Sequence, residues 1–220
     1  MCGRYSQTAS LKELRERFGF AASEVTELKP RYNIAPTQDA PVLVDDGGLA
    51  LKMFRWGLIP SWSKDAAIGH KPINARAETV AEKPSFRKPL RSRRCLVLAD
   101  GFYEWRVLPG GGKQPLRAAL KSREPFTLAG LWDEWKSPDG KSVRTFTIVT
   151  AEAEPSFREI HTRMPVLLDP KDRAPWLDAK TPVEELLPLL HARPGLETYA
   201  VSTLVNSPRN DVPACLEPAV

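Results

Sequence analysis

Short apolar runs separated by turn-forming residues set the pattern of this 220-residue chain. Pro41–Val44 and Leu49–Trp56 flank the turn Asp45-Asp46-Gly47-Gly48, which predicts a β-hairpin. Similar runs predict further strands at Arg94–Leu98, Phe102–Arg106, Leu116–Leu120, Phe126–Trp132, Thr145–Thr150, Met164–Leu168 and Thr198–Ser202.

Helical spacing is clearest at Ser10–Phe18, where apolar residues share one face of the predicted helix. Ser10 is suited to the N-cap, and Glu13 follows three residues later as in a capping box. Other helices are predicted at Ala75–Ala81, Pro155–Ile160, Lys171–Trp176 and Val183–His191.

The order of these elements predicts the fold class. Most strands connect by short turns rather than through helices, which favours antiparallel sheets over a parallel α/β arrangement. We therefore predict an α+β protein with curled, barrel-like sheets and helices packed outside them. No repeat or composition break divides the chain, so residues 2–220 are expected to form a single domain.

Composition narrows the cellular setting. No apolar run approaches the roughly 20 residues that span a bilayer, and the N-terminus lacks a signal-peptide pattern. The cysteines Cys2, Cys95 and Cys215 have no CxxC spacing, which suits a reducing cytoplasm and argues against a thiolate zinc site. We expect a cytoplasmic protein without metal, cofactor or membrane partner, and a monomer because no long apolar stripe suggests a dimer.

The chain carries a net charge of +5 and a pI near 9.2, a surplus that attracts polyanions such as nucleic acid. Part of this charge is concentrated in Arg87, Lys88, Arg91, Arg93 and Arg94. Taken alone, this cluster favours a solvated basic loop over a binding site.

Cys2 is the most reactive candidate, because loss of Met1 leaves an α-amine and a thiol on one residue. The amine attacks an aldehyde to give an imine, and the thiolate then closes on the imine carbon to form a thiazolidine. An α-amine has a pKa of about 7.7–8.0 against about 10.4 for Lys, so it is the better imine-forming group near neutral pH. The alternative is a small residue at a frayed terminus.

Three further residues have both a chemical and a structural interpretation. Asn74 is predicted to cap a helix whose N-terminus suits a phosphate or an oxyanion, and the alternative is that it serves only as a cap. Glu104 lies between aromatic residues, where desolvation raises a carboxyl pKa as a general acid requires, but on an open strand face it is inert. His161 can shuttle protons or simply interact with a helix end.

Six motifs give these residues a shared context. In this order they closely resemble the motifs of the SOS-response-associated peptidase (SRAP) family, from Cys2 to about Pro218, with Leu98 replacing a proline expected in many relatives. The motifs are Cys2-Gly3-Arg4-Tyr5, Arg31-Tyr32-Asn33-Ile34-Ala35-Pro36-Thr37, Trp56-Gly57-Leu58-Ile59-Pro60, Asn74-Ala75-Arg76-Ala77-Glu78-Thr79, Gly101-Phe102-Tyr103-Glu104-Trp105 and His161-Thr162-Arg163-Met164-Pro165.

The resemblance implies covalent capture of abasic sites in single-stranded DNA, including single-strand/double-strand junctions, with nucleoid association during DNA damage. It implies that Cys2 supplies amine and thiol, Asn74 orients the terminus and the sugar, Glu104 acts as acid and base, and His161 assists sugar-ring opening. The implied DNA contacts come from Arg4, Asn33, Pro36, Trp62, Arg76, Trp105, Thr150 and Arg163.

Three alternatives remain open at this stage. The imine can undergo β-elimination, which gives lyase activity, and an N-terminal Cys followed by Gly also resembles N-terminal-nucleophile amidohydrolases that perform acyl transfer. In that second picture, autoproteolytic removal of Met1 accounts for the peptidase label. A non-enzymatic DNA-binding module with an incidental Cys2 is the third possibility.

Overall fold

A closed five-stranded β-barrel forms the centre of the protein. The computed structural model describes residues 2–66, 68 and 72–219, so Met1 and its predicted removal lie outside the described residues. Antiparallel pairing runs in the order β11-β10-β7-β4-β5, and parallel pairing of β5 with β11 closes the ring. The bounds are β4 Asp39–Asp45, β5 Leu49–Trp56, β7 Arg94–Ala99, β10 Phe126–Lys136 and β11 Ser142–Glu152.

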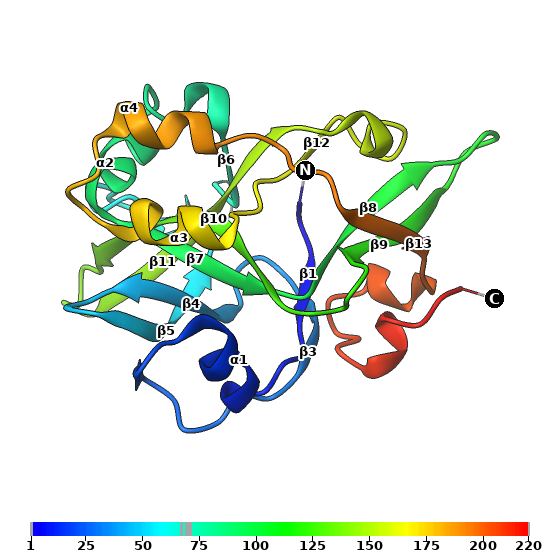
Figure 1. Ribbon diagram of the computed structural model, residues 1–220, viewed down its shortest axis with the longest axis horizontal. Helices are drawn as coiled ribbons and strands as arrows, with labels where there is room; N and C mark the ends of the chain where they lie inside the picture. The colour runs from blue at the N-terminus through cyan, green and yellow to red at the C-terminus, as the bar shows by residue number, and fades with distance from the viewer. Residues whose placement is uncertain (1, 67, 69–71, 220) are drawn as a thin grey trace.

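A second, antiparallel sheet lies beside the barrel, and β1 runs between the two (Figure 1). Its strand order is β13-β9-β8-β1-β3. Its bounds are β13 Leu196–Ala200, β9 Lys113–Leu120, β8 Gly101–Val107, β1 Tyr5–Gln7 and β3 Arg31–Ile34. The short strands β2 Ala22–Ser23, β6 Asn74–Arg76 and β12 Arg163–Pro165 extend the barrel sheet.

Helices cover the outside of the barrel, with α1 below it and α2, α3 and α4 above it in Figure 1. Their bounds are α1 Leu11–Phe18, α2 Pro84–Ser92, α3 Pro170–Leu177 and α4 Val183–Leu186. The 3₁₀ helices are η2 Ala77–Thr79, η3 Pro155–Phe157, η4 Leu187–Leu189, η5 Thr203–Asn206 and η6 Pro213–Cys215. No helix in the described part of the chain is long and apolar enough to cross a membrane.

Alternation along the barrel strands separates two apolar cores. Val42 and Val44 belong to one buried cluster with Trp56 and Cys2, whereas Leu43, between them in sequence, belongs to a second cluster that includes helix residues. This is the period of two expected when successive side chains of a strand point to opposite faces. The first cluster fills the barrel and reaches the N-terminus, and the second packs the helices onto the outer surface.

The predicted α+β fold with barrel-like antiparallel sheets is confirmed, as are the hairpin and the first helix. Ser10 caps α1, and its hydroxyl oxygen and the Glu13 carboxylate form the reciprocal capping box. Other predicted elements are shifted or shortened: helix α4 ends at Leu186 and continues only as η4, which contains Pro188. The predicted strand Met164–Leu168 is regular only in β12, with an isolated bridge at Leu167.

Two predictions near the site were wrong. Residues Ala75–Ala81 do not form a helix, because Asn74–Arg76 pair in parallel with β11 as β6 and only η2 follows. The basic cluster is not a loop, because most of it lies in or beside α2, which begins with Pro84 in its first turn. Arg94, at the start of β7, is buried and donates hydrogen bonds to four backbone carbonyls.

A buried ion pair joins the barrel to the second sheet. Asp100 lies between β7 and β8, and its carboxylate accepts hydrogen bonds from Arg117 at 2.8 Å and from the Ser6 hydroxyl at 2.5 Å. Its other oxygen accepts from the backbone N–H of Thr8 at 2.5 Å. Both charged side chains are 5% exposed. The pair therefore attaches β1 to β8 and β9 from inside the protein.

Replacing Arg117 with Met should destabilise the protein by about 3–5 kcal/mol, because the Asp100 carboxylate remains buried without its partner. Urea unfolding measures this loss. The matched control is Lys12→Met, which breaks the exposed Lys12–Glu16 pair and should change stability by less than about 0.5 kcal/mol. A loss below about 1 kcal/mol for Arg117→Met would contradict the anchoring role.

Candidate active site

The candidate site forms where the N-terminus meets strand β8. Cys2 precedes β1 and is 0% exposed. In the β1–β8 pairing Tyr5 lies opposite Phe102, and the backbone N–H of Tyr103 donates to the Arg4 carbonyl at 2.9 Å. Because β1 and β8 are antiparallel, continuing this pairing from Tyr5 toward the N-terminus places the start of the chain beside Glu104.

Asn74 holds the backbone of Cys2. Its side-chain Nδ2 donates a hydrogen bond to the Cys2 carbonyl at 2.8 Å. The parallel pairing of β6 with β11 places Asn74 opposite Ile148, one of the residues of the buried barrel core. The predicted contact with the terminus is therefore present, although Asn74 does not cap a helix. Its Oδ1 is buried and has no hydrogen-bond partner within the described residues.

Glu104 supplies a buried carboxylate next to the cysteine. Glu104 lies on β8 and is only 5% exposed. Burial raises the pKa of the Cys2 thiol well above its usual range, and the negative charge of Glu104 raises it further. A hydrogen bond from the backbone N–H of Arg4 lowers that pKa, but its effect is smaller. The folded site therefore favours a protonated thiol at neutral pH.

His161 lies in the turn between η3 and β12. The backbone N–H of Arg163 donates to its Nδ1 at 3.0 Å, and the Arg163 carbonyl oxygen lies 3.1 Å from the same nitrogen. A neutral ring that accepts at Nδ1 carries its proton on Nε2, while a protonated ring donates from Nδ1 to the carbonyl. The local backbone accommodates both states. Since β6 and β12 both pair with β11 at Thr150, the turn lies near the strand of Asn74.

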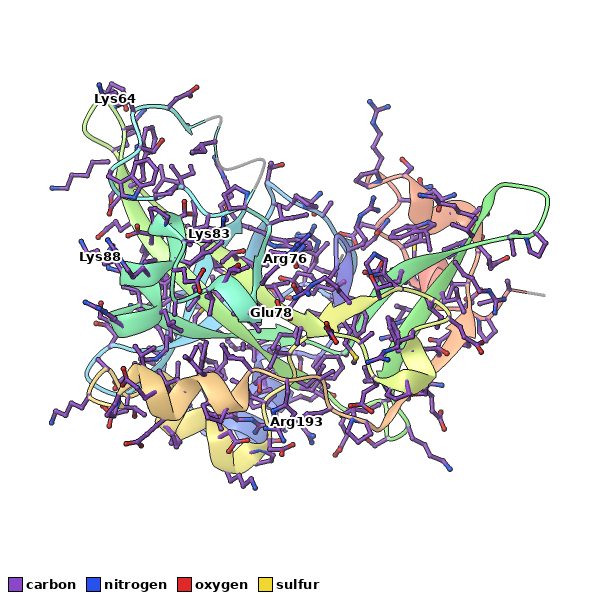
Figure 2. All side chains as sticks on the ribbon, turned by 90° about the horizontal axis from the view of Figure 1, so that it is seen from above. Lys64, Arg76, Glu78, Lys83, Lys88 and Arg193 are labelled. Atoms are coloured by element: carbon purple, nitrogen blue, oxygen red, sulfur yellow. The ribbon has the colours of Figure 1, made fainter. Side chains whose placement is uncertain are left out.

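Arg163 bridges three elements beside this turn. Its guanidinium donates to the Thr150 carbonyl at 2.7 Å and to the Glu78 carboxylate at 2.9 Å. Burial opposes ionisation of Glu78, but the hydrogen bonds and charge of Arg163 lower its pKa overall. Figure 2 shows Glu78 and Arg76 near the middle of the view from above, with Lys88 of α2 and Lys83, the N-cap of that helix, to their left. Glu78 was not among the residues that the sequence predicted for the site.

The remaining residues predicted to bind DNA divide by exposure. Trp62 is 60% exposed and Arg76 is exposed, so both present their side chains to solvent. Pro36 and Trp105 are half-buried. Thr150 is fully buried, and its hydroxyl oxygen accepts a 3.4 Å hydrogen bond from Nε of Arg163.

Arg4 and Asn33 are held inside the protein. Asn33 is fully buried; its oxygen accepts from Arg4 at 2.8 Å, and its Nδ2 donates to three carbonyls of the C-terminal segment. Arg4 also donates to the carbonyl of Val205 at 2.7 Å. In this arrangement both side chains organise the protein beside the site, and any contact of theirs with DNA stays a prediction.

Comparison with known proteins agrees with this architecture. The family model described as SOS response associated peptidase (SRAP) matches residues 1–208. Abasic site processing protein YoqW of Bacillus subtilis is 43% identical over 222 residues, covering 99% of both chains. Abasic site processing protein HMCES of Gallus gallus is 37% identical over 224 residues, covering 86% of this chain and 66% of that protein.

A crystal structure of a Bacteroides thetaiotaomicron protein superposes with a TM-score of 0.90 at 28% identity, covering all of both chains. Because the family model spans most of the sequence, the chain belongs to the SRAP family.

Neutralising Glu104 should allow the Cys2 thiol to ionise at lower pH, because a negative neighbour no longer opposes formation of the thiolate. The measurement is an NMR titration of protein labelled with ¹³Cβ-cysteine, comparing wild type with Glu104→Gln at the same state of N-terminal processing. Cys95, whose thiol pKa is raised by burial alone, is the internal control. Identical Cys2 titrations in the two proteins would contradict the electrostatic coupling.

Proposed function

We propose that this protein senses abasic sites in single-stranded DNA and captures them covalently through Cys2, as a thiazolidine that shields the lesion. The observation that carries the proposal is the hydrogen bond from Asn74 to the Cys2 carbonyl, beside the buried carboxylate of Glu104. Membership of the SRAP family, and similarity to proteins named abasic site processing proteins, support the choice of DNA as the substrate.

The reaction requires that Met1 is first removed, so that the nitrogen of Cys2 becomes a free amine. This amine adds to the aldehyde carbon of the opened sugar, and loss of one water gives an imine. The sulfur then bonds to the imine carbon, and the thiol proton passes to the nitrogen. One C–N and one C–S bond form for each water released, and no oxidant or cofactor is needed.

The electrostatics of the site suggest the order of these steps. Because burial and Glu104 raise the thiol pKa, the thiol is mostly protonated when the aldehyde arrives, and the amine reacts first. Glu104 then accepts the thiol proton as the sulfur closes the ring and passes it to the nitrogen, and reversal runs the same two transfers backward. The Arg4 backbone N–H, which lowers the thiol pKa, stabilises the transient thiolate.

Opening of the sugar precedes this chemistry, because an abasic deoxyribose is mostly a closed hemiacetal. A proton delivered to the ring oxygen exposes the aldehyde. We assign this assistance to His161, whose protonated ring donates from Nδ1 to the Arg163 carbonyl and delivers the Nε2 proton to the sugar, which leaves a neutral imidazole. Asn74 orients the terminus through the Cys2 carbonyl, and its unpartnered Oδ1 is available to the sugar.

DNA binding is assigned to Arg76 and Trp62, which are exposed, and to Arg163, whose guanidinium pairs with Glu78 in the free protein. Arg76 and Arg163 pair with phosphates on either side of the lesion, while Trp62 offers an open ring on which an unpaired base can stack. The same surface accepts single-strand/double-strand junctions. The protein acts as a monomer on cytoplasmic DNA and associates with the nucleoid during DNA damage.

Cys2→Ala should abolish the stable adduct on single-stranded DNA that carries one abasic site. It should retain weak strand cleavage, because the imine still forms and β-elimination then breaks the strand. A denaturing gel resolves adduct, cleaved strand and intact strand. A heat-stable adduct formed by Cys2→Ala would exclude the thiazolidine mechanism.

The same gel separates the alternative functions. Absence of an adduct from the wild-type protein, together with hydrolysis of glutamine or peptides, would favour an N-terminal nucleophile that performs acyl transfer. Reversible DNA binding alone would favour a binding module in which Cys2 is incidental.

Asn74→Ala should slow crosslinking by about twofold to tenfold at saturating DNA, the range expected for one hydrogen bond. The rate constant from a time course of adduct formation measures the effect. A protein that keeps one extra residue ahead of Cys2 is the companion variant and should bind DNA without crosslinking. An unchanged crosslinking rate for Asn74→Ala would contradict the proposal that Asn74 orients the terminus.

A further inference from the structure

The C-terminal segment, residues 203–211, packs against several residues predicted to bind DNA. Donors from the N-terminal half of the chain reach it: Arg4 and Asn33 donate to its carbonyls, and the backbone N–H of Asn33 donates to Asp211 at 2.9 Å. A further hydrogen bond joins the indole Nε1 of Trp105 to Oδ1 of Asn206 at 2.7 Å. The segment thus forms one side of the candidate DNA surface.

The contact with Asn206 fixes the orientation of an aromatic ring. An indole N–H can only donate, so the side-chain oxygen of Asn206 must face Trp105 and its amino group must turn away. The Arg4 guanidinium lies 5.8 Å from the centroid of the same ring, and its Nη2 contacts the Asn206 carbonyl at 3.5 Å. Asn206 therefore holds the edge of the Trp105 indole, and Arg4 lies over its face. Arg4 is itself held by its hydrogen bond to the Val205 carbonyl.

We propose that Asn206 is a positioning residue for DNA binding, which fixes the plane of the Trp105 indole so that a base next to the lesion stacks on it. This role rests on the proposed function. A ring already held in its bound orientation loses less side-chain entropy when DNA binds than a freely rotating ring does. Asn206 itself is exposed and near the end of the short helix η5, so its side chain carries little of the core.

A double-mutant cycle tests the role. Asn206→Ala removes the acceptor, and Trp105→Phe keeps an aromatic face but lacks the N–H donor. Each should weaken noncovalent binding of single-stranded DNA by about threefold to tenfold. The double variant should be no weaker than the weaker single variant, because both changes remove the same hydrogen bond. Adduct formation by Asn206→Ala at saturating DNA should keep its wild-type rate.

Indole ¹⁵N NMR of the free protein detects the Trp105–Asn206 hydrogen bond in the absence of DNA. The Trp105 N–H resonance, assigned by its loss in Trp105→Phe, should shift in Asn206→Ala. Asn210→Ala is the matched control: its amide donates to the Leu204 carbonyl at 2.8 Å within the same segment. It should leave the Trp105 resonance in place and combine additively with Trp105→Phe.

Additive losses for Asn206→Ala and Trp105→Phe, unchanged affinity in Asn206→Ala, or a slower reaction of that variant at saturating DNA would each overturn the positioning role. These outcomes are distinct from failure of the proposed function. If the wild-type protein neither binds single-stranded DNA nor forms the adduct, the proposed function fails and the positioning role fails with it.

Discussion

The buried Asp100–Arg117 ion pair fixes the strand on which the candidate site depends. Asp100 lies where the chain leaves the barrel for β8, and its carboxylate also accepts from Ser6 of β1 and from Thr8. A buried charge must keep its partner, so this constraint favours one register of β1. Cys2, three residues before β1, is thereby brought beside the strand that carries Glu104.

Burial serves both the fold and the proposed chemistry. Cys2 belongs to the apolar cluster that fills the barrel, and this desolvation is the largest cause of its raised thiol pKa. In the proposed reaction, a thiol kept protonated leaves the first step to the amine, and Glu104, whose charge acts on that thiol, receives the proton later. The exposed Trp62 and Arg76 lie outside this core, where DNA can reach them.

Local patterns predicted the barrel hairpin and α1 because the signals at Asp45–Gly48 and at Ser10 act within a few residues. Asn74 was assigned to a helix because its strand exists only through pairing with β11, more than seventy residues away. Helix α2 was not predicted, because its basic residues and Pro89 obscure the helical pattern in the sequence. Burial of Asn33 and the anchoring of Arg4 by the C-terminal segment depend on tertiary contacts, for which the sequence gives no local signal.

Peptide mass spectrometry of the purified adduct tests the central claim most directly. The tryptic N-terminal peptide, Cys2-Gly3-Arg4, should lack Met1 and carry the sugar remnant with the loss of one water. It should resist thiol alkylation and should no longer react as a primary amine, because a thiazolidine consumes the thiol and converts the amine of Cys2 to a secondary ring amine. Attachment at a lysine, or a Cys2 adduct that still accepts a thiol reagent, would contradict the account.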